Sequence, residues 1–238
     1  CILPFETEFF RKLNYSVDYV GNPSVDSVAQ YKEKQVSGAD TFIADEGLAD
    51  KPILALLAGS RRQEIKDNLP TMLEVAAAYP DYQPVIAGAP GLEPDYYKQY
   101  IGNHPARIVF GKTYDLLQHS RVALVTSGTA TLETSLFRVP QVVCYYVAAG
   151  RLASFIFRNF FHTKYISLVN LIAGREVVQE LFGARFSYQQ IRDELGKILH
   201  DTAYRQQMLD GYDEIICLLG KPGASQRTAE LIYRSLGH

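Results

Sequence analysis

The feature that most constrains this chain is a series of short apolar runs separated by stretches with helical character. Each run is apolar at successive positions and does not alternate between apolar and polar residues, so both faces of each predicted strand are buried. Uniformly apolar strands that alternate with helices are typical of a parallel sheet covered on both sides. The sequence therefore predicts an α/β fold with a doubly wound parallel sheet over residues 51–186. Its five predicted strands lie in the segments PILALLAG, YQPVIAGAP, ARIVFG, VALVTSG and PQVVCYYV.

The two flanks of this region differ from it. Residues 1–50 contain a predicted strand end, a short helix, a strand in SVDYVGNP and a polar linker with one helical piece. Ser187 is a suitable N-cap, and residues 187–238 keep helical spacing to the end. We therefore expect three parts, 1–50, 51–186 and 187–238. Because the chain opens with CILPFE, without Met and inside a predicted strand, we interpret it as a piece of a longer protein.

Charge and cysteine content limit the function classes. The 238 residues carry a formal net charge of −2 with a pI near 6.2, which argues against a nucleic-acid partner. The three cysteines are far apart, which indicates free thiols in a reducing compartment and no disulfide framework or zinc site. No apolar run approaches the roughly 18–20 residues that span a bilayer.

The first candidate site follows the first apolar strand of the series, at Gly59, Ser60 and Arg61. A helix that begins here presents unpaired amides and a partial positive charge, which suits an anion. Gly59 allows close backbone approach, and Arg61 adds a charge-assisted donor for phosphate. The alternative is a capped surface helix in which Arg61 or Arg62 pairs with Glu64.

A second glycine–serine turn follows a later apolar strand, in TSGTATLE. Ser127, Gly128 and Thr129 supply small donors at a helix start, and Glu133 lies one turn further on. A carboxylate at such a place accepts the hydroxyls of a ribose in other nucleotide sites, whereas the alternative is a capping-box pair. Two such turns in one parallel sheet predict a single cleft that binds a nucleoside diphosphate.

A third stretch, SLVNLIAGREVVQEL, places Asn170 among apolar residues. A buried amide costs free energy unless it finds hydrogen-bond partners. Gly174, Arg175 and Glu176 are predicted to open another helix. The alternative is a loop with an Asx turn.

The segment from Thr134 to Arg175 lacks Asp and Glu, although it contains several arginines, a lysine and many aromatic residues, as in RLASFIFRNFFHTKY. A basic, aromatic segment in an acidic protein indicates an anionic apolar partner, such as a membrane surface with phospholipid headgroups. The alternative is a core-packing helix with ordinary surface arginines.

Several nucleotide-binding motifs are missing from the sequence: a G-x-x-x-x-G-K-[ST] loop, a G-x-G-x-x-G turn after a strand, and a D-x-D carboxylate pair. We therefore expect amides and arginine to neutralise the diphosphate, with no metal and no cofactor.

With these residues described, the chain resembles the lipid-A-disaccharide synthases over essentially its whole length. Ala58 stands where the family usually has proline. We expect this difference to reduce the rigidity of the following turn and to have no other effect. The segments that carry the resemblance are, in order, ILPFE, YVGNP, LLAGSRRQEI, SGTATLE, VNLIAGRE and GASQRTAELI.

The resemblance implies a GT-B architecture, in which two Rossmann-like domains face each other across a cleft. This chain would then be the end of the acceptor domain, the linker and the whole donor domain, without the N-terminal half. The implied reaction moves 2,3-diacylglucosamine from UDP to the 6-hydroxyl of 2,3-diacylglucosamine 1-phosphate. It also implies a cytoplasmic protein, peripheral on the cytoplasmic face of the inner membrane of a Gram-negative bacterium.

The resemblance also assigns roles to residues. Gly59, Ser60 and Arg61 would meet the diphosphate together with Ser127, Gly128 and Thr129, and Glu133 would take the ribose. The donor pocket near the uracil and the sugar would be shaped by Asn170, Gly174, Arg175 and Glu176. The catalytic base is expected in the missing half, so none is assigned here.

Two other hypotheses remain open from the sequence. One is a different GT-B sugar-nucleotide enzyme, such as a UDP-N-acetylglucosamine 2-epimerase. The other is a nucleotide-binding domain that catalyses nothing. For the last helix, residues 224–236, we expect it either to hang free or to pack on a second copy and form a homodimer.

Overall fold

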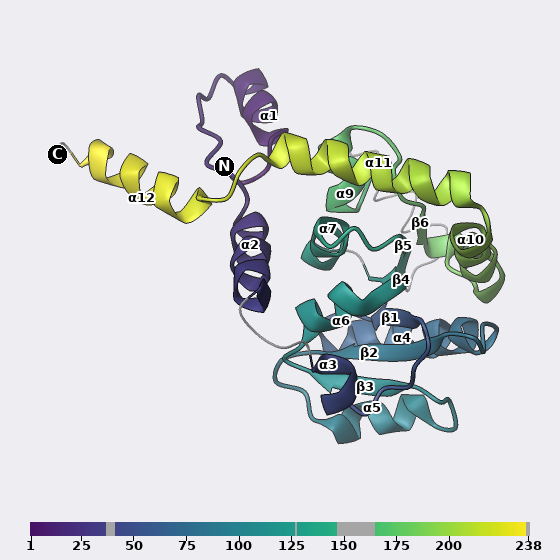
Figure 1. Ribbon diagram of the computed structural model, residues 1–238. Coiled ribbons are helices and arrows are strands. Elements are labelled where there is room, and N and C mark those ends of the chain that lie inside the picture. Colours follow the sequence, from purple (N-terminus) through teal and green to yellow (C-terminus); the bar gives the residue numbers. More distant parts are fainter. Residues whose placement is uncertain (37–40, 127, 147–164, 237–238) are drawn as a thin grey trace.

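The computed structural model describes residues 1–36, 41–126, 128–146 and 165–236. In this part of the chain six parallel strands form one sheet in the order β3-β2-β1-β4-β5-β6 (Figure 1). The predicted α/β class and doubly wound parallel sheet are confirmed. The strands are β1 (Ile53–Leu57), β2 (Gln83–Gly88), β3 (Arg107–Phe110), β4 (Ser120–Val125), β5 (Gln141–Tyr145) and β6 (Glu180–Phe182).

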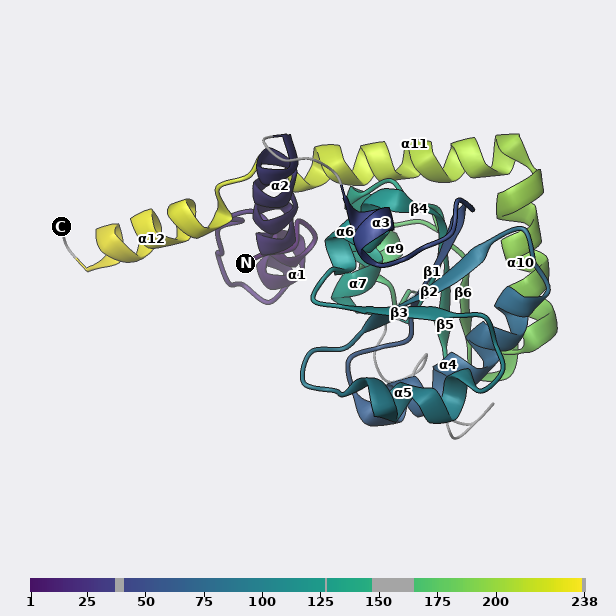
Figure 2. The same ribbon diagram turned by 60° about the horizontal axis from the view of Figure 1, so that its bottom comes forward.

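Helices connect these strands and extend beyond both ends of the sheet. Figure 2 shows α4 and α5 near one another and α11 running along the opposite side of the molecule. The described helices are α1 (Glu6–Lys12), α2 (Pro23–Val36), α3 (Phe42–Asp45), α4 (Arg62–Ala77), α5 (Pro94–Ile101), α6 (Thr113–His119), α7 (Thr129–Leu136), α9 (Leu168–Ala173), the 3-10 helix η1 (Gly183–Arg185), α10 (Tyr188–His200), α11 (Thr202–Leu219) and α12 (Ala224–Ser235).

The central strand β1 is buried on both faces. Leu54 belongs to an apolar cluster with Leu69 of α4, and its neighbour Ala55 belongs to a second cluster with Leu116 of α6. Successive residues of a strand point to opposite faces, so a strand covered by helices on both sides must be apolar at every position. This is why the run in β1 does not alternate.

The position of the cleft follows from the strand order. β1 lies between β2 and β4, with Leu56 in register with Ile86 on one side and Leu124 on the other. The chain winds outward from β1 to β2 and β3, then returns to β4 on the other side. In open α/β sheets, ligands bind outside the carboxyl ends of the strands at such a reversal.

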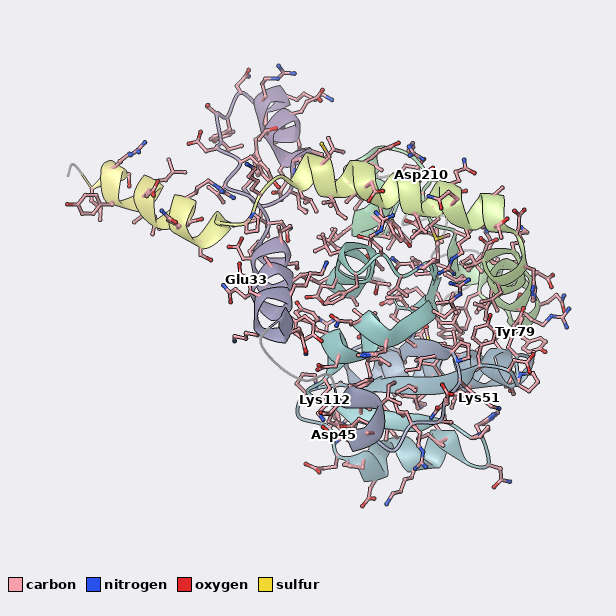
Figure 3. The ribbon with its side chains drawn as sticks, in the orientation of Figure 1. Glu33, Asp45, Lys51, Tyr79, Lys112 and Asp210 are labelled. Carbon is pink, nitrogen blue, oxygen red and sulfur yellow. The ribbon has the colours of Figure 1, made fainter. Side chains whose placement is uncertain are left out.

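The C-terminal helices complete the same core. Ile191 of α10 and Tyr212 of α11 are fully buried in the cluster that also holds Leu54. Tyr79, labelled in Figure 3, donates a hydrogen bond of 2.7 Å from its hydroxyl to the carbonyl of Arg192 in α10. Ser187 accepts a hydrogen bond from the Gln190 amide and so caps α10, as predicted. The three-part division at residues 50 and 186 stays a prediction.

The N-terminal segment differs from the sequence prediction. Residues 2–5 and 15–22 contain no strand, and the predicted linker contains the helices α2 and α3. Tyr19 is held by tertiary contact, because its hydroxyl donates to the carbonyl of Leu219 at 2.8 Å. The strand predicted in SVDYVGNP is wrong, because this segment has no strand structure.

Helix α12 projects away from the sheet in both ribbon views (Figures 1 and 2). Its start is tied to α2, because the Asp26 carboxylate accepts hydrogen bonds from the amides of Gly223 at 2.6 Å, Ala224 at 3.2 Å and Ser225 at 3.2 Å. Toward its end the helix exposes apolar side chains, including Ile232, which is 56% exposed, and Leu236 directly after the helix is 70% exposed. Among the described helices, none is both long and apolar enough to cross a membrane.

Helix α4 starts at Arg62, directly after the glycine turn, as the first candidate site requires. The segment PTMLEVAAAY, taken alone, predicts a helix with Pro70 in its first turn, but Pro70 lies inside α4. Ile65, Leu69 and Met72 follow one another at helical spacing and are completely buried. Burial of this face outweighs the hydrogen bond that a proline removes from a helix interior.

Candidate functional site

A cleft of about 380 Å³ lies at the carboxyl ends of β1, β2 and β4 and reaches the start of α6. Its position is the reversal point between β1 and β4, where the sheet topology favours a ligand site. The two predicted glycine turns meet in this cleft, which confirms that they lie at one edge of the sheet. Its walls contain Leu57, Gly59, Ser60, Arg61, Glu64, Ala87, Gly88, Ala89, Pro90, Thr113, Thr126, Gly128, Thr129 and Ala130.

One wall is the start of α4. Gly59 has φ +112°, a conformation that favours glycine, and it turns the chain from β1 into the helix. The amides of Ser60 and Arg61 donate to Glu64 Oε2 at 2.9 and 3.2 Å, and Arg61 Nη1 donates to Glu64 Oε1 at 3.0 Å. The structure therefore combines the two alternatives: the helix is capped by its own Glu64, and the same residues line the cleft.

The opposite wall is the start of α7. Gly128 has φ +133° and precedes Thr129, the first residue of the helix, and both are exposed. In the described part of the chain no side chain caps this helix start. Helix N-termini carry unpaired amides, so this wall offers hydrogen-bond donors to a ligand. Ser127, also predicted for the site, lies outside the described residues.

Sequence reasoning missed Thr126, which directly follows β4. The residue belongs to the cleft lining although it is only 2% exposed, and its buried hydroxyl has no hydrogen-bond partner among the described residues. A buried hydroxyl without a partner is costly, so the cleft holds a polar group that a ligand could satisfy. The sequence signal was present: a polar residue at the carboxyl end of an apolar strand.

Glu133 lies one turn along α7 from Thr129, next to the cleft but not in its lining. Tyr114 donates a hydrogen bond to Glu133 Oε1 at 2.8 Å, so the capping-box alternative does not describe this carboxylate. Burial raises the pKa of Glu133, and the bond from Tyr114 opposes the rise only partly. Burial and the neighbouring carboxylate raise the pKa of Tyr114 above its usual range. Perturbed carboxylates beside a cleft are common at functional sites.

The residues of the third stretch lie apart from the cleft lining. Asn170 is completely buried, and its side chain is hydrogen-bonded to Val178 and Glu180. Gly174 ends α9 with φ +66°. The helix expected to open there is wrong, because β6 follows instead.

Arg175 and Glu176 line a separate cavity of about 150 Å³ beside α11. Arg175 pairs with Glu214 of α11 at 2.6 Å, and Glu176 accepts a hydrogen bond from Gln179 at 2.7 Å. The role predicted for these residues in a donor pocket is not tested by this placement.

Residues 147–164 of the basic, aromatic segment lie outside the described part of the chain. Two of its arginines are described, and both pair with acids of α11: Arg138 with Asp213 and Arg175 with Glu214. These two charges are therefore balanced within the fold and are not left for an anionic surface.

A larger cavity, of about 550 Å³, lies at the opposite edge of the sheet. Its walls include Lys51, Gln83 and Arg107, which stand at or just before the amino ends of β1, β2 and β3. Because parallel sheets of this kind bind ligands at the carboxyl ends of their strands, we take the smaller cleft as the candidate site.

Comparison with known proteins agrees with these features. The model of the family described as lipid-A-disaccharide synthetase matches residues 1–231. The chain belongs to this family. It is 37% identical over 246 residues to the lipid-A-disaccharide synthase of Myxococcus xanthus, covering 99% of this chain and 62% of that protein. It is 35% identical to the synthase of Anaeromyxobacter dehalogenans, covering 97% of this chain and 60% of that protein. The chain thus spans about three fifths of the length of these curated lipid-A-disaccharide synthases.

Solved structures support the GT-B-like fold of this lipid-A-disaccharide synthetase family member. A structure described as a co-structure of S. aureus MnaA with UDP superposes with a TM-score of 0.62 at 16% identity, covering 93% of this chain and 55% of that one. The UDP-GlcNAc 2-epimerase from Neisseria meningitidis, bound to UDP-GlcNAc, gives 0.61 at 16% identity, covering 98% and 60%. At this identity the likeness establishes the fold alone.

Proposed function

We propose that this chain is the donor-binding part of a glycosyltransferase of lipid A assembly. The enzyme transfers 2,3-diacylglucosamine from UDP to the 6-hydroxyl of 2,3-diacylglucosamine 1-phosphate and releases UDP. Membership of the lipid-A-disaccharide synthetase family supports the reaction. The observation that carries the donor site is the convergence of Gly59–Arg61 and Gly128–Thr129 on one cleft.

The cleft suggests how the chain acts on the donor. Ser60, Arg61 and the amides at the start of α7 hold the diphosphate, and Thr126 adds a hydroxyl donor. As UDP departs, negative charge grows on the phosphate that leaves the sugar. Donors that are already oriented stabilise this charge more in the transition state than in the ground state. Ser127 belongs to the same proposed anion site, and Glu133 accepts the ribose hydroxyls.

The remaining parts of the reaction are proposals without a place in the described cleft. Asn170, Gly174, Arg175 and Glu176 shape the donor pocket near the uracil and the sugar. A general base is needed to take the proton of the acceptor hydroxyl, and it lies in a part of the enzyme beyond this chain. The isolated chain therefore binds UDP without turning the donor over.

The surroundings of the enzyme follow from its lipid substrates. Both substrates carry acyl chains, so the enzyme works peripherally on the cytoplasmic face of the inner membrane. The basic, aromatic stretch RLASFIFRNFFHTKY contacts the anionic lipid surface there. Flotation with liposomes tests this: binding that depends on anionic lipid and falls with salt supports the contact, and equal flotation without anionic lipid contradicts it.

The donor site is tested by calorimetry with UDP in the absence of added metal. Arg61→Ala should weaken binding by about 1.5–3 kcal/mol, the range for a hydrogen bond to a charged group. Arg62→Ala is a matched control, because its guanidinium lies 4.7 Å from the centre of the Tyr96 ring and it does not line the cleft. Unchanged affinity in Arg61→Ala, or an equal loss in both variants, would contradict the phosphate assignment.

Family membership decides against a UDP-N-acetylglucosamine 2-epimerase, the first alternative from the sequence. The second alternative, a nucleotide-binding domain that catalyses nothing, agrees with what we propose for the isolated chain. An assay with the complete enzyme distinguishes a transferase from a nucleotide-binding protein without activity. Turnover that is lost with Arg61→Ala supports the transferase.

A further inference from the structure

The two helix starts that face the cleft differ in one respect. At α7 no side chain of the described chain caps the helix, whereas at α4 a carboxylate of the chain itself is bound. Glu64 accepts from the Ser60 amide at 2.9 Å, the Arg61 amide at 3.2 Å and the Arg61 guanidinium at 3.0 Å. Two backbone amides and a guanidinium around one anion are the donor set that binds a phosphate group.

The backbone is shaped to admit this carboxylate. A Cβ atom at Gly59 would lie 2.6 Å from both Cβ and Oε2 of Glu64, so a residue other than glycine would push the side chain away. The Glu64 side chain is 18% exposed, whereas that of Arg61 is 82% exposed. The carboxylate therefore sits against the cleft wall, and the guanidinium lies over it toward solvent.

An independent feature of the same cleft points to a ligand. Thr126 belongs to the cleft lining, and its buried hydroxyl has no hydrogen-bond partner among the described residues. The cleft thus combines donors at Thr126 and α7 that no described side chain occupies with donors at α4 that Glu64 occupies.

We propose that Glu64 is an internal competitor for the phosphate site, and that a nucleoside diphosphate binds by displacing its carboxylate from Ser60 and Arg61. This inference rests on the proposed function of the cleft. The side chain rotates away from the amides, and Arg61 exchanges one anionic partner for another. A ligand without phosphate cannot replace the Glu64 carboxylate on these donors. The competition therefore affects the binding of phosphate-bearing ligands and not that of uncharged ones.

The test compares wild type with Glu64→Gln, which keeps the shape of the side chain and removes its charge. If the carboxylate occupies the amides about nine tenths of the time, its loss strengthens UDP binding roughly tenfold, because apparent affinity scales with the competent fraction. Uridine, which has no phosphate, should bind both proteins equally. Asp67→Asn is the control, because Asp67 is on the same helix and accepts hydrogen bonds from Gln63.

Calorimetry with UDP and with uridine gives the affinities, and Glu64→Ala serves as a second variant that removes both oxygens. Thermal melting shows whether each variant is folded. A gain for UDP alone in a folded Glu64 variant supports the proposal. Equal affinity in wild type and variant overturns it, and so does weaker binding, which would mean that Glu64 holds Arg61 in place for the ligand.

The design separates this inference from the proposed function. If wild type binds UDP and both Glu64 variants bind it no better, only the competition is wrong. If neither wild type nor the variants bind UDP, the proposed donor site fails and the competition fails with it.

Discussion

At the scale of single residues, burial of the Glu133 carboxylate beside the cleft lowers the stability of the folded protein at neutral pH. Burial raises the pKa of this carboxylate, so folding penalises the charged form relative to the unfolded chain. A group whose pKa is raised on folding stabilises the protein below its unfolded pKa, and this contribution is lost as pH rises through the folded value. At neutral pH the charged carboxylate is therefore a burden on the folded state.

We expect Glu133→Gln to stabilise the protein at pH 7 by up to about 1 kcal/mol, within the usual range for single substitutions. The gain should shrink as pH falls toward the ordinary carboxylate value of 4.5. The same variant should weaken UDP binding, since the ribose loses a charged acceptor. Chemical denaturation at pH 4 and pH 7 and calorimetry with UDP measure the two effects.

Glu74→Gln is the control, because Glu74 is exposed on α4. A Glu133→Gln protein that is no more stable at pH 7 than wild type would contradict the account of its burial. Unchanged UDP affinity would contradict the ribose assignment.

At the scale of elements, the connection from α9 to β6 is held by one side chain. Asn170 Oδ1 accepts from the amides of Val177 at 2.7 Å and Val178 at 3.1 Å. Its Nδ2 donates to the Val178 carbonyl and to Glu180 Oε1, both at 2.9 Å. An amide that uses all of its bonding capacity inside the fold is a structural clamp, and this explains a buried asparagine in an apolar run.

We expect Asn170→Ala to lower the free energy of unfolding by about 2–4 kcal/mol, because it leaves several buried polar groups without partners. Asn170→Asp should be at least as damaging, since it places a second carboxylate beside Glu180. Urea denaturation measures both, with Asn103→Ala in an exposed turn as control. Lost UDP affinity at unchanged stability would show that Asn170 acts on the ligand and not on the fold.

The joint between α2 and α12 is a second element-scale device. Burial alone would raise the pKa of Asp26, but the amides of Gly223, Ser225 and Ala224 and the charge of Arg227 outweigh it and lower the pKa. A carboxylate with a lowered pKa contributes stability above its ordinary value of 3.8, and this contribution is lost as pH falls through the folded pKa.

We therefore expect α12 to loosen below about pH 4, and Asp26→Ala to loosen it at pH 7 by about 1–2 kcal/mol, the usual cost of losing a helix cap. Hydrogen exchange over residues 224–236 measures the loosening. Equal protection in the variant and wild type at pH 7 would contradict the role of this cap.

At the scale of the whole molecule, α12 exposes an apolar side. Ile232 is 56% exposed and Leu236 is 70% exposed. Apolar side chains that gather on one projecting helix mark an interaction surface more often than isolated ones do. A homodimer through this helix is our proposal for the chain as it stands.

We expect the chain to self-associate and Ile232→Glu with Leu236→Glu to shift it to monomer without changing UDP affinity. Light scattering measures the mass over a concentration series, and Ala229→Glu, an exposed position of the same helix, is the control. A wild-type monomer at all concentrations would contradict the homodimer.

The sequence predicted the sheet well because its strands are buried on both faces and so are apolar throughout. β6 was missed because it has only three residues and begins with Glu180. Pro70 alone would place the start of α4 too late, because it is a strong local signal that burial of Ile65 and Leu69 overrides. At the site, the two glycine turns were predictable from local motifs. The bond from Tyr114 to Glu133 and the unpaired Thr126 hydroxyl were not, since they depend on elements brought together by the fold.

The chain returns from β3 to β4, which lies beside β1. This topology places the residues that would bind a ligand at one edge of the sheet, outside the packed core. Most of the cleft lining comes from turns and helix starts at the strand ends, whereas most of the packing that stabilises the sheet lies inside the layers, and Leu57 and Ala89 belong to both. Evolution can therefore rewrite the turns and leave the framework intact. This makes the turns after β1 and β4 the natural places to graft a new specificity.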